Sequence, residues 1–202
     1  MKKASTAVFF TVALSLLGTG CSSIRLVDSE VNSFARWSPA PPARGATYRF
    51  ERLPSQQSQQ SGELPQEQIE AMARSALDKV GLVNNPAAAA FNVQIGASTS
   101  YAQRYPYDSY GGPGVSLGAG SGGGFLGLSF PLMRHDPPLY KREVSVVMRD
   151  ARSNAVVYET RAAHSGVWGD ARAVLPAMFD AALRGFPAPP PGPRRVDIEI
   201  PR

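Results

Sequence analysis

Residues 143–164 read EVSVVMRDARSNAVVYETRAAH, and this stretch decides the fold. Apolar and small residues alternate with polar ones on both sides of a turn at 150–154, through Val144, Val146 and Met148 and then Val156, Tyr158, Thr160 and Ala162. A period of two is typical of a strand with one buried face. The sequence therefore predicts a β-hairpin, whose other face can pair Glu143 or Glu159 with Arg149 or Arg161.

Two amphipathic helices are expected on either side of this hairpin. The first covers 65–81, with Pro65 in its first turn and Gly81 as its stop signal. Its apolar residues recur every three or four positions, at Ile69, Met72, Ala73, Ala76, Leu77 and Val80. The second is expected to be regular from Leu175, with Pro176 in its first turn, and to end before Pro187.

Three further strands are predicted over 23–37, 47–53 and 91–101. The polar repeat 55–62 is expected to be a flexible surface loop. Residues 187–193 are a polyproline-like spacer, and 196–200 alternate like an edge strand or an adhesive tail. Together these elements predict an α+β fold, in which an antiparallel sheet carries two helices on one face and a long Gly-rich hairpin or loop.

The chain begins with MKKASTAVFFTVALSLLGTGC, which has the features of a signal peptide over residues 1–20. Lys2 and Lys3 are followed by an apolar run at 7–17 that is too short to span a bilayer. Small residues then lead to a cleavage site after Gly20. Cys21 is the only cysteine of the chain, so no disulfide accounts for it.

Removing residues 1–20 leaves 182 residues, which is enough for one domain with a core. We divide them into an acylated N-terminus with the first strand region (21–45), an α+β domain (46–187) and a Pro-rich C-terminal tail (188–202). The formal net charge falls from +5 to +3 without the two leader lysines, and the arginines are scattered. No nucleic-acid partner is therefore expected.

Candidate catalytic features are weak. Gly118–Gly123 has the glycine spacing of a dinucleotide site, but a strand-like run follows it instead of a helix, so no cofactor is expected. His164, Ser165 and Asp170 supply a base, a nucleophile and an orienting acid without any motif that places them. His135 and His164 are too isolated to predict a metal site.

The aromatic stretch YAQRYPYDSY at 101–110 is the most suggestive surface feature. Tyrosine and arginine beside glycines can stack on glycan rings or form an adaptable protein contact, although the same residues can also be the base of a plain loop. If the protein has a binding surface, we expect it to use Arg104, Tyr105, Tyr107 and Tyr110.

Gly18-Thr19-Gly20-Cys21 resembles the lipobox of bacterial lipoproteins, with Gly18 at the usual leucine position. The resemblance implies acylation of Cys21, and Ser22 in place of aspartate implies sorting to the outer membrane. Over 31–187, four motifs resemble a family of Gram-negative lipoproteins whose domain has no known function; the motifs are Tyr48-Arg49-Phe50, Gly81-Leu82, Val146 to Asp150 and Phe186-Pro187.

The expected function is that of a non-catalytic lipoprotein, anchored to the outer membrane by acyl chains on Cys21 with its domain facing the periplasm. It would bind or organise an envelope protein or glycan. The alternative is a periplasmic hydrolase that uses His164. A third possibility is carriage of a small apolar ligand between the helices and the sheet.

Overall fold

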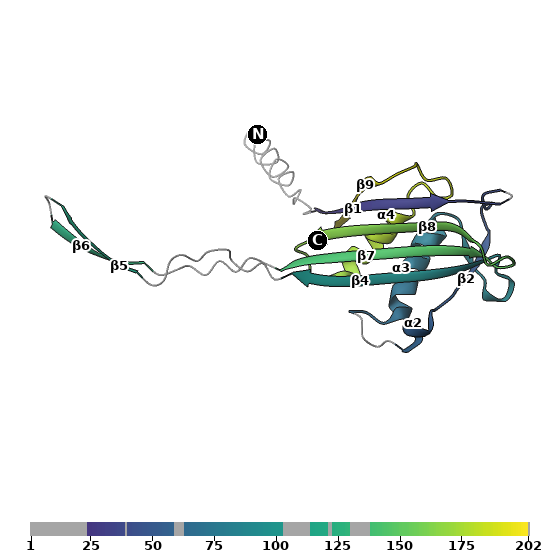
Figure 1. Cartoon of the computed structure of the whole chain (residues 1–202), viewed down its shortest axis with the longest axis horizontal. Helices are drawn as coiled ribbons and strands as arrows, with labels where there is room; N and C mark the ends of the chain where they lie inside the picture. The colour runs from purple at the N-terminus through teal and green to yellow at the C-terminus, as the bar shows by residue number, and fades with distance from the viewer. Residues whose placement is uncertain are drawn as a thin grey trace, which may run out of the picture.

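The computed structural model describes residues 24–38, 40–58, 63–102, 114–120, 123–129 and 138–201. The elements along the chain are β1 (Ile24–Ala35), β2 (Thr47–Phe50), α2 (Pro54–Ser58), α3 (Gln66–Lys79), β3 (Val83–Asn84), the 3-10 turn η2 (Pro86–Ala88), β4 (Phe91–Ala102), β5 (Gly114–Gly120), β6 (Gly123–Ser129), β7 (Leu139–Asp150), β8 (Val156–Gly166), α4 (Ala171–Ala182) and β9 (Arg194–Pro201). A seven-stranded sheet has the order β3-β2-β4-β7-β8-β1-β9, and β5 pairs with β6 in a separate sheet (Figure 1). The α+β class is confirmed.

The β7–β8 hairpin lies at the centre of the sheet, as the sequence predicted. Arg161 and Glu143 form an ion pair of 3.3 Å between the two strands. The register shifts between Met148 and Arg149, so β8 carries one extra residue there. That extra residue reverses the alternation, so Val156 is 40% exposed, contrary to its expected place in the buried set.

The sheet is mixed, which corrects the prediction of an antiparallel sheet. β2 runs parallel to both β3 and β4, whereas the other neighbouring strands of the large sheet are antiparallel. Parallel neighbours need a crossover connection, and α3 lies within the connection from β2 to β4. The four-residue strand β2 gave no sequence signal for its direction, so only the tertiary arrangement decides it.

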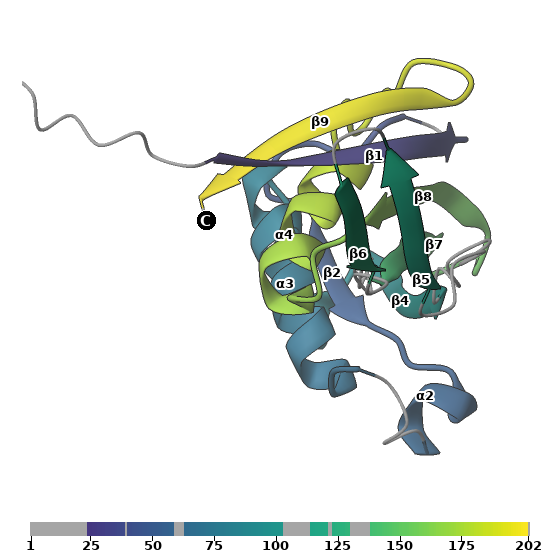
Figure 2. The same ribbon diagram turned by 90° about the vertical axis from the view of Figure 1, so that its left-hand side faces the viewer.

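Helices α3 and α4 lie beside each other on the same side of the large sheet (Figure 2). α4 contacts β1, β7, β8 and β9, whereas α3 contacts β3 and β4. An ion pair of 2.6 Å between Lys79 and Asp180 links the two helices. The fully buried side chains between helices and sheet include Leu77, Ile95, Met148, Met178 and Phe179. Among the described residues, no helix is long and apolar enough to cross a membrane.

Two predictions of local structure were wrong. α4 begins at Ala171 and carries Pro176 in its interior, because Asp170 caps the helix and the first turn is buried through Ala171 and Val174. The first part of the polar repeat forms the short helix α2 instead of a loop. Residues 59–62 of that repeat lie outside the described part of the chain.

β9 completes the sheet as its outer strand. It pairs with β1 from Arg194 opposite Val31 to Pro201 opposite Ile24. Residues 194–201 therefore extend the sheet beyond β1, which is the edge strand that the alternation of 196–200 indicated.

One end of the sheet, which we call the Trp37 end, is closed by aromatic packing. The Trp37 ring stacks on Tyr158 with centroids 5.7 Å apart and meets Phe186 edge-on at 5.6 Å. Trp37 Nε1 also donates a 2.7 Å hydrogen bond to the main-chain oxygen of Pro187. The motif Phe186-Pro187 thus has a structural role at this end.

Candidate functional site

Strands β1, β4, β7 and β9 begin or end at the opposite end of the sheet, which we call the Ile24 end. β4 finishes there at Ala102, opposite Leu139 at the start of β7, and Ile24 of β1 lies opposite Pro201 of β9. Figure 1 shows the start of β1 and the C-terminus at this same end. The chain before Ile24 and the connection 103–137 therefore both join the sheet at the Ile24 end.

Large apolar side chains are exposed around the Ile24 end. On β1, Ile24 is 57% and Leu26 is 47% exposed. Tyr101, near the end of β4, is 75% exposed, and Val167, directly after β8, is 46% exposed. A single exposed apolar residue is ordinary, but several of them at one end of a sheet make a candidate contact surface.

Two arginines lie against aromatic rings at the same end. The Arg25 guanidinium is 4.5 Å from the ring centroid of Trp168, and that of Arg142 is 4.9 Å from the ring centroid of Tyr140. The Arg142 side chain has no solvent exposure. It donates to the main-chain oxygens of Trp168 at 2.6 Å and Gly169 at 2.8 Å. Arg142 therefore fixes the connection from β8 to α4 and holds Trp168 in place.

A second candidate site is an open hollow of about 430 Å³ where β1 separates from β8. The β1–β8 pairing ends at Glu30 opposite Ala163, while β1 continues along β9 to Ile24. Arg195 and Asp28 form an ion pair of 2.9 Å there. The hollow is lined by residues of both charges, namely Asp28, Ser29, Glu30, Ala163, Ser165, Pro193, Arg194 and Arg195.

His164 is held by Asp28, one of the residues that line this hollow. Its Nδ1 lies 2.6 Å from the main-chain oxygen of Asp28 and 3.1 Å from the carboxylate. The histidine is only 4% exposed, and Nε2 is buried with no hydrogen-bond partner in the described structure. A Cβ atom at Gly166 would lie 2.8 Å from Nε2, so this ring nitrogen is closely enclosed.

The structure does not assemble the predicted triple of His164, Ser165 and Asp170. Ser165 follows His164 within β8, so the two side chains point to opposite faces of the sheet. Asp170 instead accepts hydrogen bonds from the main-chain nitrogens of Arg172 at 3.0 Å and Ala173 at 3.4 Å. Its carboxylate therefore caps α4, and Asp28 takes the position beside the histidine.

The other predicted site residues are not placed by the structure. Gly20, Cys21, Arg104, Tyr105, Tyr107, Tyr110 and His135 all lie outside the described residues. Gly118 belongs to β5, and the described element after it is the strand β6. Within the described part of the chain, no three His, Cys, Asp or Glu side chains are close enough to hold a metal ion.

Sequence reasoning missed Asp28, Arg142 and Trp168 as parts of these sites. Arg142 has a usable signal, because it shares the inward alternation of Val144 and Val146 in β7. A charged residue at that position predicts buried acceptors. Asp28 has no comparable signal, since its contact with His164 spans 136 positions of the chain.

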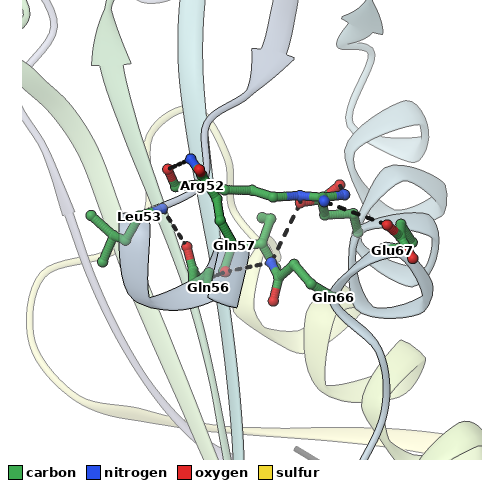
Figure 3. Close-up of polar contacts among 8 residues, drawn as sticks. Arg52, Leu53, Gln56, Gln57, Gln66 and Glu67 are labelled. Carbon is green, nitrogen blue, oxygen red and sulfur yellow. Dashed lines mark hydrogen bonds and ion pairs between the residues drawn. The ribbon is translucent and has the colours of Figure 1, made fainter. Parts of the chain in front are cut away.

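A polar network closes the edge of β4 where β2 ends (Figure 3). The amides of Gln56 and Gln66 donate to the main-chain oxygen of Ile95 at 2.7 and 3.1 Å. Arg52 forms two hydrogen bonds of 2.7 and 2.9 Å with Glu70, and the side-chain bond raises the pKa of the guanidinium. These contacts satisfy a sheet edge and tie α2 to α3, so we assign the network a structural role.

The fold defines an α+β domain with a mixed seven-stranded sheet. The chain belongs to the DUF4136 family, described as a domain of unknown function, whose model matches residues 31–188. This match agrees with the resemblance found in the sequence to a domain without a known function. The comparison with curated proteins found no match.

One similar solved structure shows likeness of fold alone. A PDZ domain protein from Parabacteroides distasonis is 11% identical with a TM-score of 0.53, and the match covers 94% of this chain. The chain spans 42% of that protein's length. Two PelC dodecamer structures from Paraburkholderia phytofirmans are 16% and 14% identical to this chain, with TM-scores of 0.45 and 0.44. The matches cover 79% and 80% of this chain, and 98% and 99% of the PelC chains.

Proposed function

We propose that this protein is a lipoprotein of the outer membrane, whose domain lies in the periplasm and acts as a non-catalytic binding or scaffolding module. The observation that carries the proposal is the only cysteine of the chain, Cys21, directly after a short apolar leader and three small residues. Two or more acyl chains on one cysteine would anchor the domain stably.

The position of the first strand supports an anchor at Cys21. β1 begins at Ile24, three residues after the cysteine, and lies between β8 and β9 in the large sheet. β1 pairs with β9 over 24–31 and with β8 over 30–35, so β9 holds the stretch that follows Cys21. Acyl chains on Cys21 would thus hold the whole domain close to the bilayer.

The arrangement around the one described histidine argues against a hydrolase that uses His164. His164 is enclosed and held by Asp28, and the serine next to it in the chain faces the other side of the sheet. General base catalysis would need a reacting group within hydrogen-bond reach of the histidine. We therefore prefer binding over the hydrolase alternative.

We place the binding surface on Arg104, Tyr105, Tyr107 and Tyr110, with an envelope protein or glycan as partner. Tyr101, three positions before Arg104 in the chain, is 75% exposed at the Ile24 end. An exposed tyrosine at the start of this stretch fits a surface built from aromatic side chains, which supply large contact area and a polar group.

In-cell cross-linking of the full-length protein tests the binding surface. Replacing Arg104, Tyr105, Tyr107 and Tyr110 together by Ser should abolish cross-linked partners while the protein stays in the outer-membrane fraction. The matched control replaces Phe34 and Val156 by Ser, because both are exposed apolar residues at the Trp37 end. Unchanged cross-links in the four-residue variant would contradict this surface.

A further inference from the structure

We propose that the Ile24 end of the sheet rests on the lipid bilayer, with Ile24, Leu26 and Val167 in the headgroup region. This inference rests on the proposed acylation of Cys21. It goes further by assigning a second, non-covalent contact with lipid and a fixed orientation of the domain, in which the Trp37 end points away from the membrane.

The length of the connecting chain limits where the domain can lie. Three residue steps separate Cys21 from Ile24, and an extended chain covers at most about 3.6 Å per residue, or roughly 11 Å in all. The acyl chains on Cys21 would place that residue at the membrane surface. The Ile24 end is therefore the part of the seven-stranded sheet closest to the bilayer.

The residues at this end have the chemistry of a membrane interface. Tyr140 and Trp168 are both partly buried, Tyr140 near the start of β7 and Trp168 in the connection after β8. Tyrosine and tryptophan favour the boundary between acyl chains and headgroups, because their rings are apolar and carry one polar group.

Charged residues fit the same assignment. Arg25 lies against Trp168 on the face of β1 opposite to Ile24 and Leu26, and Lys141 is exposed near the start of β7. Both basic side chains are at the Ile24 end, where they can meet lipid phosphates. Glu199 is the acidic residue opposite Leu26 on β9. Farther from the Ile24 end, the acidic residues Asp28 and Asp197 both pair with Arg195.

The two tryptophans of the chain allow a direct test. Trp168 lies at the Ile24 end, whereas Trp37 packs on Tyr158 at the other end. The acylated protein is reconstituted in phosphatidylethanolamine and phosphatidylglycerol vesicles with brominated acyl chains, as Trp37→Phe and Trp168→Phe variants. We expect bromine to quench Trp168 in the first variant and to leave Trp37 emission unchanged in the second.

Equal quenching of both tryptophans, or none of Trp168, would overturn the proposed orientation. Circular dichroism of both variants first establishes that each is folded. A patch variant gives an independent measurement on the wild-type tryptophans. Leu26→Asp with Val167→Asp should abolish the quenching, whereas Phe34→Asp with Val156→Asp, which are exposed at the Trp37 end, should leave it unchanged.

A chemical coupling of the protein to vesicles tests the lipid-facing end independently of the proposed acylation. Because Cys21 is the only cysteine, its thiol can be coupled to a maleimide phospholipid in the same vesicles. Quenching of Trp168 in the coupled protein would support the lipid-facing end even if cells do not acylate Cys21. Absence of quenching in coupled and acylated protein alike would reject the lipid-facing end and leave the anchor intact.

Discussion

The guanidinium of Arg142 donates a 2.6 Å hydrogen bond to the main-chain oxygen of Trp168, although the Arg142 side chain has no contact with solvent. This bond joins the inner face of β7 to the connection between β8 and α4. The guanidinium also donates to the main-chain oxygen of Gly169 at 2.8 Å and lies 3.5 Å from a carboxylate oxygen of Glu63. The geometry of the Ile24 end thus depends on one buried cation.

Replacing Arg142 by Leu should lower the free energy of unfolding by about 2–4 kcal/mol, because two main-chain oxygens lose their donor in a buried place. Urea denaturation measures the change. The matched control is Arg161→Leu, whose ion pair with Glu143 is exposed and should contribute less than about 1 kcal/mol. Equal losses in the two variants would show that burial of Arg142 has no special importance.

Asp170 should act as a helix cap and not as a catalytic residue. Asp170→Ala removes the acceptor for the main-chain nitrogens of Arg172 and Ala173, and should cost about 1 kcal/mol of stability. Asp170→Asn keeps an acceptor oxygen and should be close to wild type. The comparison uses thermal unfolding of the three proteins, and a large loss in the Asn variant would require a role for the charge.

Thr160 joins the central sheet to the end of α4. Its Oγ1 donates to the main-chain oxygen of Ala182 at 2.8 Å and lies 2.7 Å from Ser33 Oγ. Thr160→Val keeps the shape and removes these bonds, so we expect a loss of about 1–3 kcal/mol in urea denaturation. Thr47→Val removes two exposed bonds, to the main-chain oxygen of Ala88 and from the main-chain nitrogen of Ala90, and should cost less because water replaces them. The reverse order would contradict this account.

Alkaline unfolding should depend on Tyr48. Burial raises the pKa of its hydroxyl from 10.0 to about 12. Below pH 10 the hydroxyl is protonated in both the folded and the unfolded protein. As the pH rises from 10 towards the folded pKa, the unfolded protein loses this proton first, so the free energy of unfolding falls. Between about pH 9 and pH 11, wild type should lose about 1.4 kcal/mol more than Tyr48→Phe. Parallel pH dependence of the two proteins in urea denaturation would contradict the raised pKa.

The elements that sequence predicted well are those whose pattern is local. The alternation from Val144 to Met148 and the helical period of 65–81 each describe one buried face, and both elements formed. The direction of β2 depends on the chain returning through α3, which no pattern within Thr47–Phe50 records. The exposure of Val156 depends on one extra residue in β8, which only the pairing with β7 reveals.

The candidate sites show the same division. A cysteine after a short apolar leader can be recognised from adjacent residues, so Cys21 could be proposed from sequence. The contact of His164 with Asp28 and the contact of Arg25 with Trp168 each join distant parts of the chain. Such pairs follow from the order of the strands, in which β1 lies between β8 and β9. The attachment point at Cys21 therefore stays a prediction, whereas these contacts between distant residues are visible only in the structure.

The most direct test of the central claim is the intact mass of the protein purified from membranes of a Gram-negative cell, beside a Cys21→Ser control. We predict a mass equal to residues 21–202 plus acyl chains, and no acylated product from the control. A soluble, unacylated product cut near Gly20 would contradict the anchor, and the assignment to the outer membrane would then fall.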